Sequence, residues 1–292
     1  MAKIREDKIY RTTGEKIVFA LVFVLFSVYA LSVVLAIVWA FYNSLKDISD
    51  FWNNNKLALP KKWLFSNYAK AAGAITDENT GTTFFGMYIN SFWYAGGMAL
   101  LSTFIHCVTG YIFAKYKFKG KELAFSFILF TIALPIVGNL PSMYKVIYRM
   151  GINDSPLILV TALGGFTGNF LITYAFFKSV DGSYAEAAQI DGAGHLYIFF
   201  RIMLPLATGP IFALSILTFI MQWNNYETPI LFLSAMPNLA SGLFIFRDSV
   251  GTRGNTPVYF AGVLMSIIPV VALVAAFGNK IMKNMSIGGL KG

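Results

Sequence analysis

The chain has 292 residues, of which 57% are hydrophobic and 13% are charged, and its formal net charge is +9. Soluble domains carry about 25% charged residues, so this composition excludes a disordered chain and a nucleic-acid-binding module, and it argues against an ordinary soluble enzyme. The basic residues lie between long apolar blocks, which is the pattern of membrane topology. One all-α membrane bundle is therefore the expected architecture.

Six blocks lack Asp, Glu, Lys and Arg for about 20 residues or more, the length that crosses a bilayer. They predict six transmembrane helices near 17–42, 86–114, 123–144, 155–177, 203–222 and 257–279. The first block is too long for the core of a signal peptide, and no small-residue cleavage site follows it, so we expect a retained first helix. Prolines inside the third, fifth and sixth blocks indicate kinks or packing contacts, with moving hinges as the alternative.

The distribution of Lys and Arg predicts the orientation of this bundle. Fourteen of them fall in the two tails and in the second and fourth connections, whereas nine fall in the other connections. Because short cytoplasmic segments carry the excess of basic residues, both termini are expected in the cytoplasm. Residues 1–16 then form a cytoplasmic tail, 46–85 and 223–256 are external loops, and 178–202 is a cytoplasmic loop.

The predicted spans contain one ionisable residue of the Asp, Glu, Lys, Arg and His set, His106. Proton-driven and voltage-driven proteins need buried carboxylates or arginines, so energy is not expected to enter through these helices. Cys107 is the only cysteine, which excludes an internal disulfide and a cysteine-based metal site. His106 and Cys107 are interpreted as a helix-packing pair.

The fourth connection carries the most informative pattern, Glu186-Ala187-Ala188 followed by Asp191-Gly192. It predicts a short helix, a glycine turn and a second short helix, because Gly192 adopts positive φ without steric cost. The two small alanines would let the first helix enter a partner's groove, and Glu186 could pair with a basic side chain there. The alternative is an ordinary surface helix-turn-helix between two spans.

The spacing E-A-A-x3-G-x9-I-x-L-P, from Glu186 to Pro205, resembles the coupling-loop motif of ABC importer permeases. The wording E-A-A-Q-I-D-G-A is similar to the carbohydrate branch, and the chain most resembles its maltose-type, MalG-like subunits. Further segments resemble that branch along nearly the whole chain: 59–63 (LPKKW), 67–68 (NY), 90–91 (NS), 222–226 (QWNNY) and 288–292 (GGLKG). The run 226–229 (YETP) departs from it, being more polar than the usual continuation.

The resemblance implies a type I ABC importer permease fold over 17–292, in the cell membrane of a prokaryote. It implies no catalytic, metal or cofactor site on this chain, with ATP and Mg bound by a separate ATPase dimer. The other implied partners are a second, MalF-like permease, an extracytoplasmic solute-binding protein and a sugar. The ATPase would seat the coupling residues Glu186, Ala187, Ala188, Asp191 and Gly192 in a cleft, and its closure would drive alternating access.

Two further sets of residues are candidates for contact with other molecules. The external segment Gly251, Thr252, Arg253, Gly254 and Asn255 is expected to reach the binding protein, a passive connector being the alternative. Sugars are bound through hydroxyl and amide hydrogen bonds and against aromatic faces. Polar side chains near midspan are therefore candidates for the substrate pathway, or otherwise for interhelical hydrogen bonds: Asn139, Thr167, Asn169, Thr173 and Thr218.

Three rival functions are weighed against a sugar importer. An ABC permease for another solute, such as a polyamine or phosphate, shares the fold, but a polyamine favours an acidic lining that the spans lack. An ion-coupled secondary transporter or channel would need a relay, for which only His106 is present. A membrane enzyme would need a nucleophile and base or a metal constellation, and the sequence contains none that is recognisable.

Overall fold

The computed structural model of the chain describes residues 12–134, 138–164, 166–250 and 254–287, and helices are its only regular elements over these ranges. The elements are α1 (Thr13–Ser44), α2 (Ile48–Asn53), α3 (Ser66–Ala74), α4 (Phe84–Lys115), α5 (Lys121–Ala133), α6 (Leu140–Met150), η1 (Pro156–Leu163), α7 (Gly168–Ser179), α8 (Ser183–Ile190), α9 (His195–Ile198), η2 (Phe199–Met203), α10 (Leu204–Leu206), α11 (Thr208–Trp223), α12 (Glu227–Phe232), α13 (Leu239–Val250) and α14 (Thr256–Ile287). The all-helical class predicted from the sequence is therefore confirmed for the described residues.

Three of the predicted spans are unbroken helices long and apolar enough to cross a membrane: α1, α4 and the first 23 residues of α14. Two more predicted spans are bent pairs. The chain turns by 56° between η1 and α7 and by 76° between α10 and α11. Counting each pair as one span raises the number of crossing elements among the described residues to five.

The third predicted span, 123–144, is not one helix. α5 ends at Ala133, and α6 starts at Leu140 with Pro141 in its first turn. Gly138 has a left-handed φ of 79°, which ends helical geometry between them, and a proline is favoured where a new helix begins because no amide donor is lost there. α6 is also amphipathic, with Lys145 and Arg149 on it, so 140–150 does not continue an apolar span.

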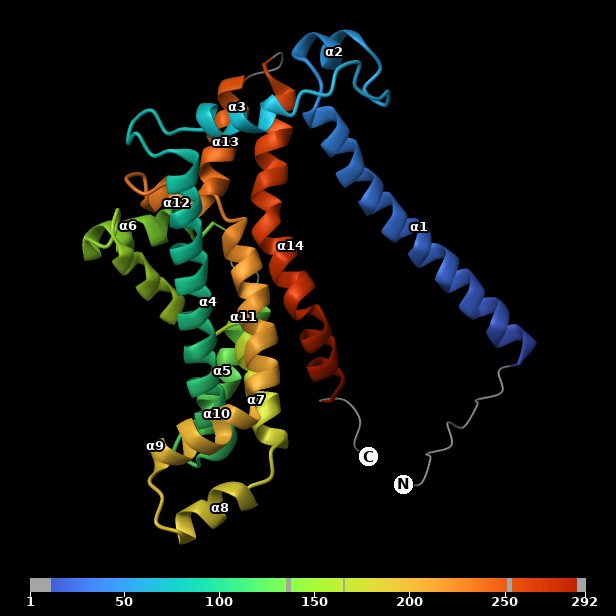
Figure 1. The fold of residues 1–292 in the computed structure, drawn as a ribbon. Helices are drawn as coiled ribbons and strands as arrows, with labels where there is room; N and C mark the ends of the chain where they lie inside the picture. The colour runs from blue at the N-terminus through green and yellow to red at the C-terminus, as the bar shows by residue number, and fades with distance from the viewer. Residues whose placement is uncertain (1–11, 135–137, 165, 251–253, 288–292) are drawn as a thin grey trace.

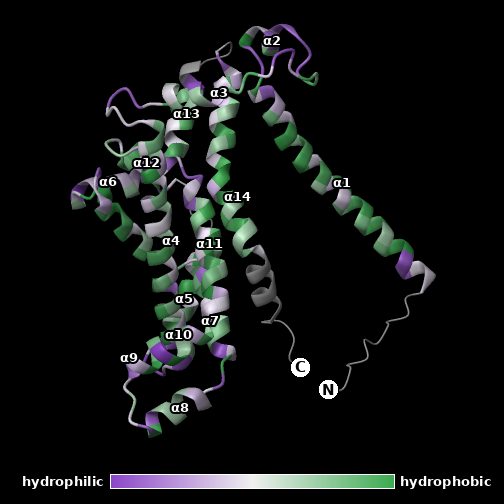
Figure 2. Cartoon of the chain, in the orientation of Figure 1, coloured by the Kyte–Doolittle hydropathy of each residue, from purple (hydrophilic) through white to green (hydrophobic). Residues whose placement is uncertain are grey.

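The bundle is built around α4, which packs along α7 and α11 (Figure 1). α14 lies against α11 and contacts α3 and α13 near its N-terminal end. Gly110 allows the closest approach of α4 to α7: a Cβ atom there would stand 2.9 Å from the backbone nitrogen of Tyr174. Figure 2 shows apolar colour along these long helices and polar colour at the two ends of the bundle.

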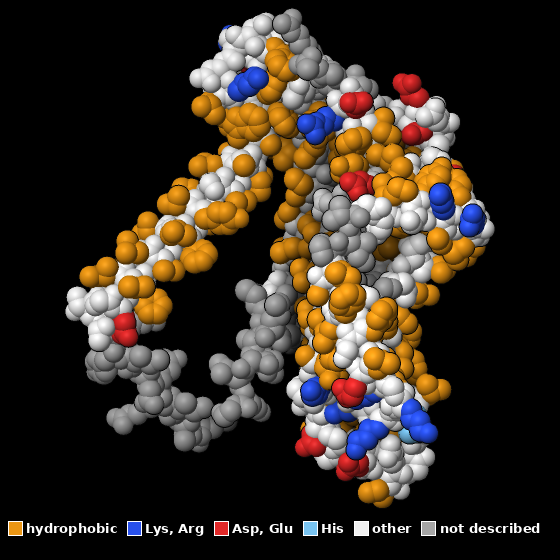
Figure 3. Space-filling model, turned by 180° about the vertical axis from the view of Figure 1, so that it is seen from behind, with side chains coloured by type: hydrophobic (Ala, Val, Ile, Leu, Met, Phe, Trp, Pro, Cys, Tyr) orange, Lys and Arg blue, Asp and Glu red, His pale blue; other side chains and the backbone are white. Residues whose placement is uncertain are grey.

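α1 stands apart from the other helices over most of its length (Figure 1), and its most apolar 18-residue stretch has no buried residue. Its contact with the bundle is near its C-terminal end, where Trp39 meets Phe260 of α14 edge-on, with ring centroids 5.3 Å apart. Figure 3 shows hydrophobic side chains along the visible face of α1, and large apolar residues are exposed throughout this helix, from Ile17 to Phe41. An all-round apolar surface is what a helix surrounded by lipid or by another apolar helix requires.

The connection 45–83 folds into a cap on one end of the bundle and contains α2 and α3. The Asn67 side chain donates to the carbonyl oxygens of Ser44 and Lys46 at 2.8 and 2.9 Å. Lys46 is 1% exposed, and its ammonium donates to the carbonyl oxygens of Asn55 and Lys56 at 3.3 and 3.4 Å. Burial lowers the pKa of Lys46, although the nearby Asp50 carboxylate acts in the opposite direction.

Candidate functional site

The predicted coupling segment is a short helix, α8, that ends in a glycine turn. The Gly192 amide donates to the carbonyl of Gln189 at 3.0 Å, and the Ala193 amide donates to that of Ala188 at 2.9 Å. These two bonds form a Schellman motif, with Gly192 in the left-handed region at φ 80°. The positive φ predicted for Gly192 from the sequence is therefore confirmed.

α8 is attached to the bundle by one buried residue. Ala188 belongs to an apolar cluster with Cys107 and Tyr111 of α4, Phe177 of α7 and Ile198 of α9. The element that α8 contacts most is η2, so a force applied to α8 reaches α4 and α7 through the other side chains of this cluster.

The opposite face of α8 is exposed. Glu186, Ala187, Asp191 and Gly192 all lie on the surface, and Ile190 is 86% exposed. Of the two alanines predicted to enter a partner's groove, Ala187 therefore faces outward, whereas Ala188 packs against this chain's own bundle. The exposed apolar side chain of Ile190 was not predicted as a contact residue. Ile190 follows Ala187 by three residues, and this spacing places both on the same face of the helix.

A side-chain hydrogen bond holds the turn that leads into α8. The Asp181 carboxylate accepts the amide of Ser183 at 2.9 Å, and this bond lowers the pKa of Asp181. The ammonium of Lys115, at the end of α4, donates to the carbonyl of Val180. The start of the coupling segment is thus tied directly to the end of α4.

A groove of about 580 Å³ separates α8 from the helix that follows it. It is lined by residues of both arms of the turn: Ala188, Asp191, Gly192, Ala193, Gly194, Tyr197, Arg201 and Ile202. Asp191 and Arg201 give this groove one charge of each sign. Its open shape suits a polypeptide surface more than an enclosed small molecule.

Four of the five predicted pathway residues meet in one polar network across α4, α7 and α11. The Thr167 hydroxyl lies 3.1 Å from Nε2 of His106. The Thr173 hydroxyl donates to the carbonyl of His106 at 2.7 Å, and the Asn169 amide lies 3.4 Å from the hydroxyl of Thr218. His106, Thr173 and Thr218 are buried, whereas Thr167 is exposed.

The network sits at the break between η1 and α7. Thr167 caps α7, since its hydroxyl accepts the amide of Asn169 at 3.3 Å. The exposed side of the network therefore contains the N-terminus of α7, the hydroxyl of Thr167 and the side-chain amide of Asn169. These groups can form hydrogen bonds with a polyhydroxyl solute. Asn139 is not part of it, because this exposed residue lies at the start of α6, on a different element.

The predicted binding-protein segment is described only in part, because Gly251, Thr252 and Arg253 lie outside the described residues. The Gly254 carbonyl accepts the indole N–H of Trp52 at 3.2 Å, which links this segment to α2. Asn255 accepts the amide of Val258 at 3.4 Å in the first turn of α14. Much of the surrounding connection, 223–256, which the sequence predicts to be external, is helical, since it contains α12 and α13.

A cavity of about 250 Å³ lies beside the W-N-N-Y run and is lined by residues of α11, α13 and α14. Tyr226 stacks on Phe244 with ring centroids 4.5 Å apart and planes 9° from parallel, and Arg247 lines the same cavity. Tyr226 belongs to the run singled out in the sequence, whereas no local pattern marks Phe244 or Arg247 as its neighbours. Only the folding of α13 back onto α14 brings them to the motif.

Comparison with known proteins identifies the class of protein to which the chain belongs. Residues 107–275, more than half of the chain, match the family described as "Binding-protein-dependent transport system inner membrane component". The chain belongs to this family of ABC transporter permease subunits. The resemblance to sugar permeases stated from the sequence is thereby confirmed.

Similar proteins carry sugar-related names. The chain is 26% identical over 267 residues to the diacetylchitobiose uptake system permease protein NgcG of Streptomyces coelicolor, covering 88% of this chain and 83% of that one. It is 29% identical over 221 residues to the arabinooligosaccharides transport system permease protein AraQ of Halalkalibacterium halodurans, covering 74% and 77%. It is also 29% identical over 238 residues to the sn-glycerol-3-phosphate transport system permease protein UgpE of Yersinia pestis, covering 80% and 84%.

A solved structure shares the fold. The bacterial ABC transporter involved in the import of the acidic polysaccharide alginate contains a chain that superimposes with a TM-score of 0.75. The match covers 93% of this chain and 99% of that chain, at 22% sequence identity. This likeness establishes the arrangement of the helices.

Proposed function

We propose that this chain is a transmembrane subunit of an ATP-driven, binding-protein-dependent importer of sugars, most simply of oligosaccharides. The observation that carries the proposal is α8. It is a surface helix with an exposed glycine turn, and its one buried residue belongs to an apolar cluster that also contains residues of α4 and α7. In this proposal ATP and Mg are bound by a separate ATPase dimer, and a second, homologous permease completes the pathway.

The mechanism follows from how α8 is attached. An ATPase that grips Glu186, Ala187 and Ile190 and then closes pulls on α8. Ala188 passes the displacement to α4 and α7, because packed interfaces shift between discrete arrangements and do not stretch. The bends between η1 and α7 and between α10 and α11 are the places where two of the spans can change angle.

Substrate would pass along the polar network at Thr167, Asn169 and Thr218. A sugar hydroxyl needs hydrogen-bonding partners in the membrane interior, and hydroxyl and amide side chains offer both donors and acceptors. On the external side, the stacked Tyr226 and Phe244 add aromatic faces near the mouth. The UgpE similarity keeps a phosphorylated polyol as the second candidate substrate, for which Arg247 supplies the positive charge.

The coupling proposal is tested by a matched glycine pair. A Cβ atom meets nothing within 4 Å at either Gly192 or Gly194, but φ is 80° at Gly192 and −73° at Gly194. Alanine at Gly192 therefore costs about 1–2 kcal/mol of backbone strain, and alanine at Gly194 costs little. Gly192→Ala and Glu186→Lys should lower both sugar uptake and stimulated ATPase activity, while Gly194→Ala leaves them unchanged. Normal stimulated ATPase activity in both altered proteins would contradict the role of α8.

The partners are tested by gentle affinity purification of the tagged chain with mass spectrometry of what accompanies it. A second permease and an ATPase should be recovered, and a binding protein recovered with them can be screened against oligosaccharides and glycerol 3-phosphate. If the chain purifies alone, and uptake survives ATP depletion but collapses with the ion gradient, the ion-coupled transporter replaces the importer.

The topology proposed with this function has six spans and cytoplasmic termini, with α5 as a short third crossing. Single-cysteine labelling tests it. Ser183→Cys on α8 should react only from the cytoplasmic side, and Lys62→Cys on the cap only from outside. The native Cys107 is buried and should stay unlabelled in the folded protein. Reaction of both new cysteines from one side would refute the orientation.

A further inference from the structure

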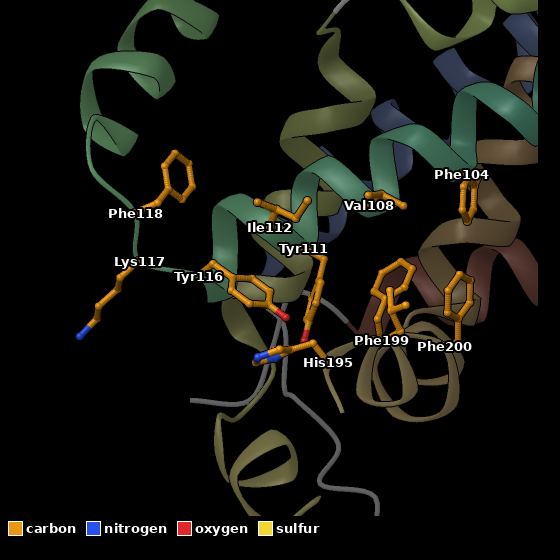
Figure 4. Close-up of a pocket in the computed structure, with 11 residues that line it drawn as sticks. Phe104, Val108, Tyr111, Ile112, Tyr116, Lys117, Phe118, His195, Phe199 and Phe200 are labelled. Atoms are coloured by element: carbon orange, nitrogen blue, oxygen red, sulfur yellow. The ribbon is translucent and has the colours of Figure 1, made fainter. Parts of the chain in front are cut away.

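A large apolar groove lies on the surface of the bundle near the coupling segment, outside the polar network described above (Figure 4). Its volume is about 600 Å³. One wall is a stripe of α4 with helical spacing, namely Phe104, Val108, Tyr111 and Ile112. The other wall is formed by α9 and the π-helical turn η2, which contribute Leu196, Phe199 and Phe200.

The groove is open to the surroundings of the bundle. Phe104 is 42% exposed and Leu196 is 76% exposed, so apolar side chains line its mouth as well as its floor. Since the chain belongs to a family of inner-membrane components, these surfaces face hydrocarbon or another apolar chain.

The groove has the length of one acyl chain. Phe104 lies eleven residues before Lys115, the last residue of α4, so the groove runs about 17 Å along the helix at 1.5 Å per residue. The hydrocarbon core of a bilayer is about 30 Å thick, and one leaflet therefore accounts for about half of it. The groove spans the depth of a single leaflet.

The polar end of the groove is basic. Figure 4 shows the Lys117 ammonium beyond the end of α4, on the side away from Phe104 and Phe200. The neighbouring Lys119 is also exposed. The His195 ring lies beside Tyr116 at this end, with ring centroids 5.5 Å apart. Basic pockets between helices on the cytoplasmic side bind anionic lipid headgroups.

We propose that this groove binds one phospholipid with an anionic headgroup. Its acyl chain would lie between α4 and η2, and its phosphate would lie near Lys117 and His195. The lipid would thereby bridge a long span and the second arm of the coupling segment. η2 is a π-helical turn, an element that is frequent at functional sites.

Native mass spectrometry of the purified protein with its associated chains tests the proposal. It measures which lipids the protein retains, with dioleoylphosphatidylglycerol and dioleoylphosphatidylcholine as probes. The anionic lipid should be retained in preference to the zwitterionic one. Lys117→Gln should weaken its retention about fivefold. Lys62→Gln, which removes an exposed lysine from the external cap, is the matched control and should change nothing.

Two variants test the apolar part of the groove. Val108→Trp should fill it and reduce retention of both lipids. Leu196→Ser changes only the exposed rim, and it should reduce retention even where the larger substitution disturbs folding. Equal retention of the two lipids, or a Lys117→Gln protein that behaves like Lys62→Gln, would overturn the proposal. So would anionic-lipid retention in the isolated chain that disappears when a partner permease is bound, since the groove would then be a protein interface.

Retention does not depend on the transported solute, so this test is separate from that of the proposed function. The expected effect of the bound lipid on coupling between the ATPase and this chain rests on the proposed function. In nanodiscs, replacing the anionic lipid with the zwitterionic one should lower stimulated ATPase activity of the native protein, and this response should be smaller in Lys117→Gln.

Discussion

The close contact of α4 and α7 at Gly110 provides the sharpest test of how the bundle is held together. A Cβ atom at Gly110 would stand 2.5 Å from Oγ1 of Thr173, 2.9 Å from the nitrogen of Tyr174 and 3.0 Å from the carbonyl carbon of Thr173. Two of these atoms are backbone, so no side-chain rotation relieves the overlap. Gly110→Ala must push the two helices apart by about half an ångström or more, because carbon contacts are optimal at about 3.5–4.0 Å.

The cost has two parts. Overpacking of a close-packed interface costs about 1–3 kcal/mol. Displacement of Thr173 also weakens its 2.7 Å hydrogen bond to the His106 carbonyl, which is worth about 1 kcal/mol. The expected loss of about 2–4 kcal/mol corresponds to a fall in melting midpoint of roughly 5–15 °C.

Two glycines on the same helix are controls. A Cβ atom at Gly96 would meet nothing within 4 Å, so Gly96→Ala should leave the midpoint unchanged or raise it. At Gly97 it would meet only the side chain of Leu159, at 2.6 Å, and that side chain can move. Gly97→Ala should therefore fall between the other two.

Cys107 supplies the assay, because it is the only cysteine and is 1% exposed. A thiol-reactive fluorophore reports its exposure as the temperature rises, and the rate at low temperature reports local opening between α4 and α7. The close-contact explanation fails if Gly110→Ala has the melting midpoint and the Cys107 labelling rate of Gly96→Ala. It fails equally if Gly97→Ala is the most damaging of the three.

Substitutions at three further residues test other parts of the fold. Lys46→Met should destabilise the external cap by about 1–3 kcal/mol, because the ammonium's bonds to two carbonyl oxygens are lost, and trypsin should then cleave the cap faster. Asp154→Ala should cost about 1–3 kcal/mol in the fluorophore assay, because this carboxylate accepts the Ala235 amide at 2.8 Å and the Ser234 hydroxyl. Asp154→Asn should cost less, since asparagine tolerates the φ of 48° at this position. The pKa of Asp181 is lowered in the folded protein. The stability contributed by its carboxylate is therefore fully present above the unfolded-state pKa and is lost as pH falls through the lower folded pKa. Proteolysis of the coupling segment should rise in acid, and Asp181→Asn should flatten that rise.

The sequence predicted the long helices well because their signal is local. Runs of about 20 apolar residues identify α1, α4 and α14 without reference to any neighbour. The same reasoning overestimated the continuity of 123–144. Hydropathy averages over a window and does not register that Gly138 leaves helical geometry and that Pro141 starts a new helix.

The coupling segment was predicted from a short motif, and its turn follows from Gly192 alone. Which alanine would face the bundle could not be predicted. Ala187 and Ala188 are identical in chemistry, and only the packing of α8 against η2 assigns Ala188 to the buried cluster. The exposure of Ile190 follows from the same placement.

By itself, the sequence determined the class of protein, the apolar helices and the glycine turn, because composition, hydropathy and backbone freedom are properties of neighbouring residues. The tertiary structure alone decided which distant side chains meet. His106 and Thr167, 61 residues apart, are joined by a hydrogen bond, whereas Asn139, an equally plausible polar residue, stays outside that network. The lipid-sized groove between α4 and η2 likewise exists only because those helices cross, since apolar residues in a membrane protein carry no local signal that separates packing from binding.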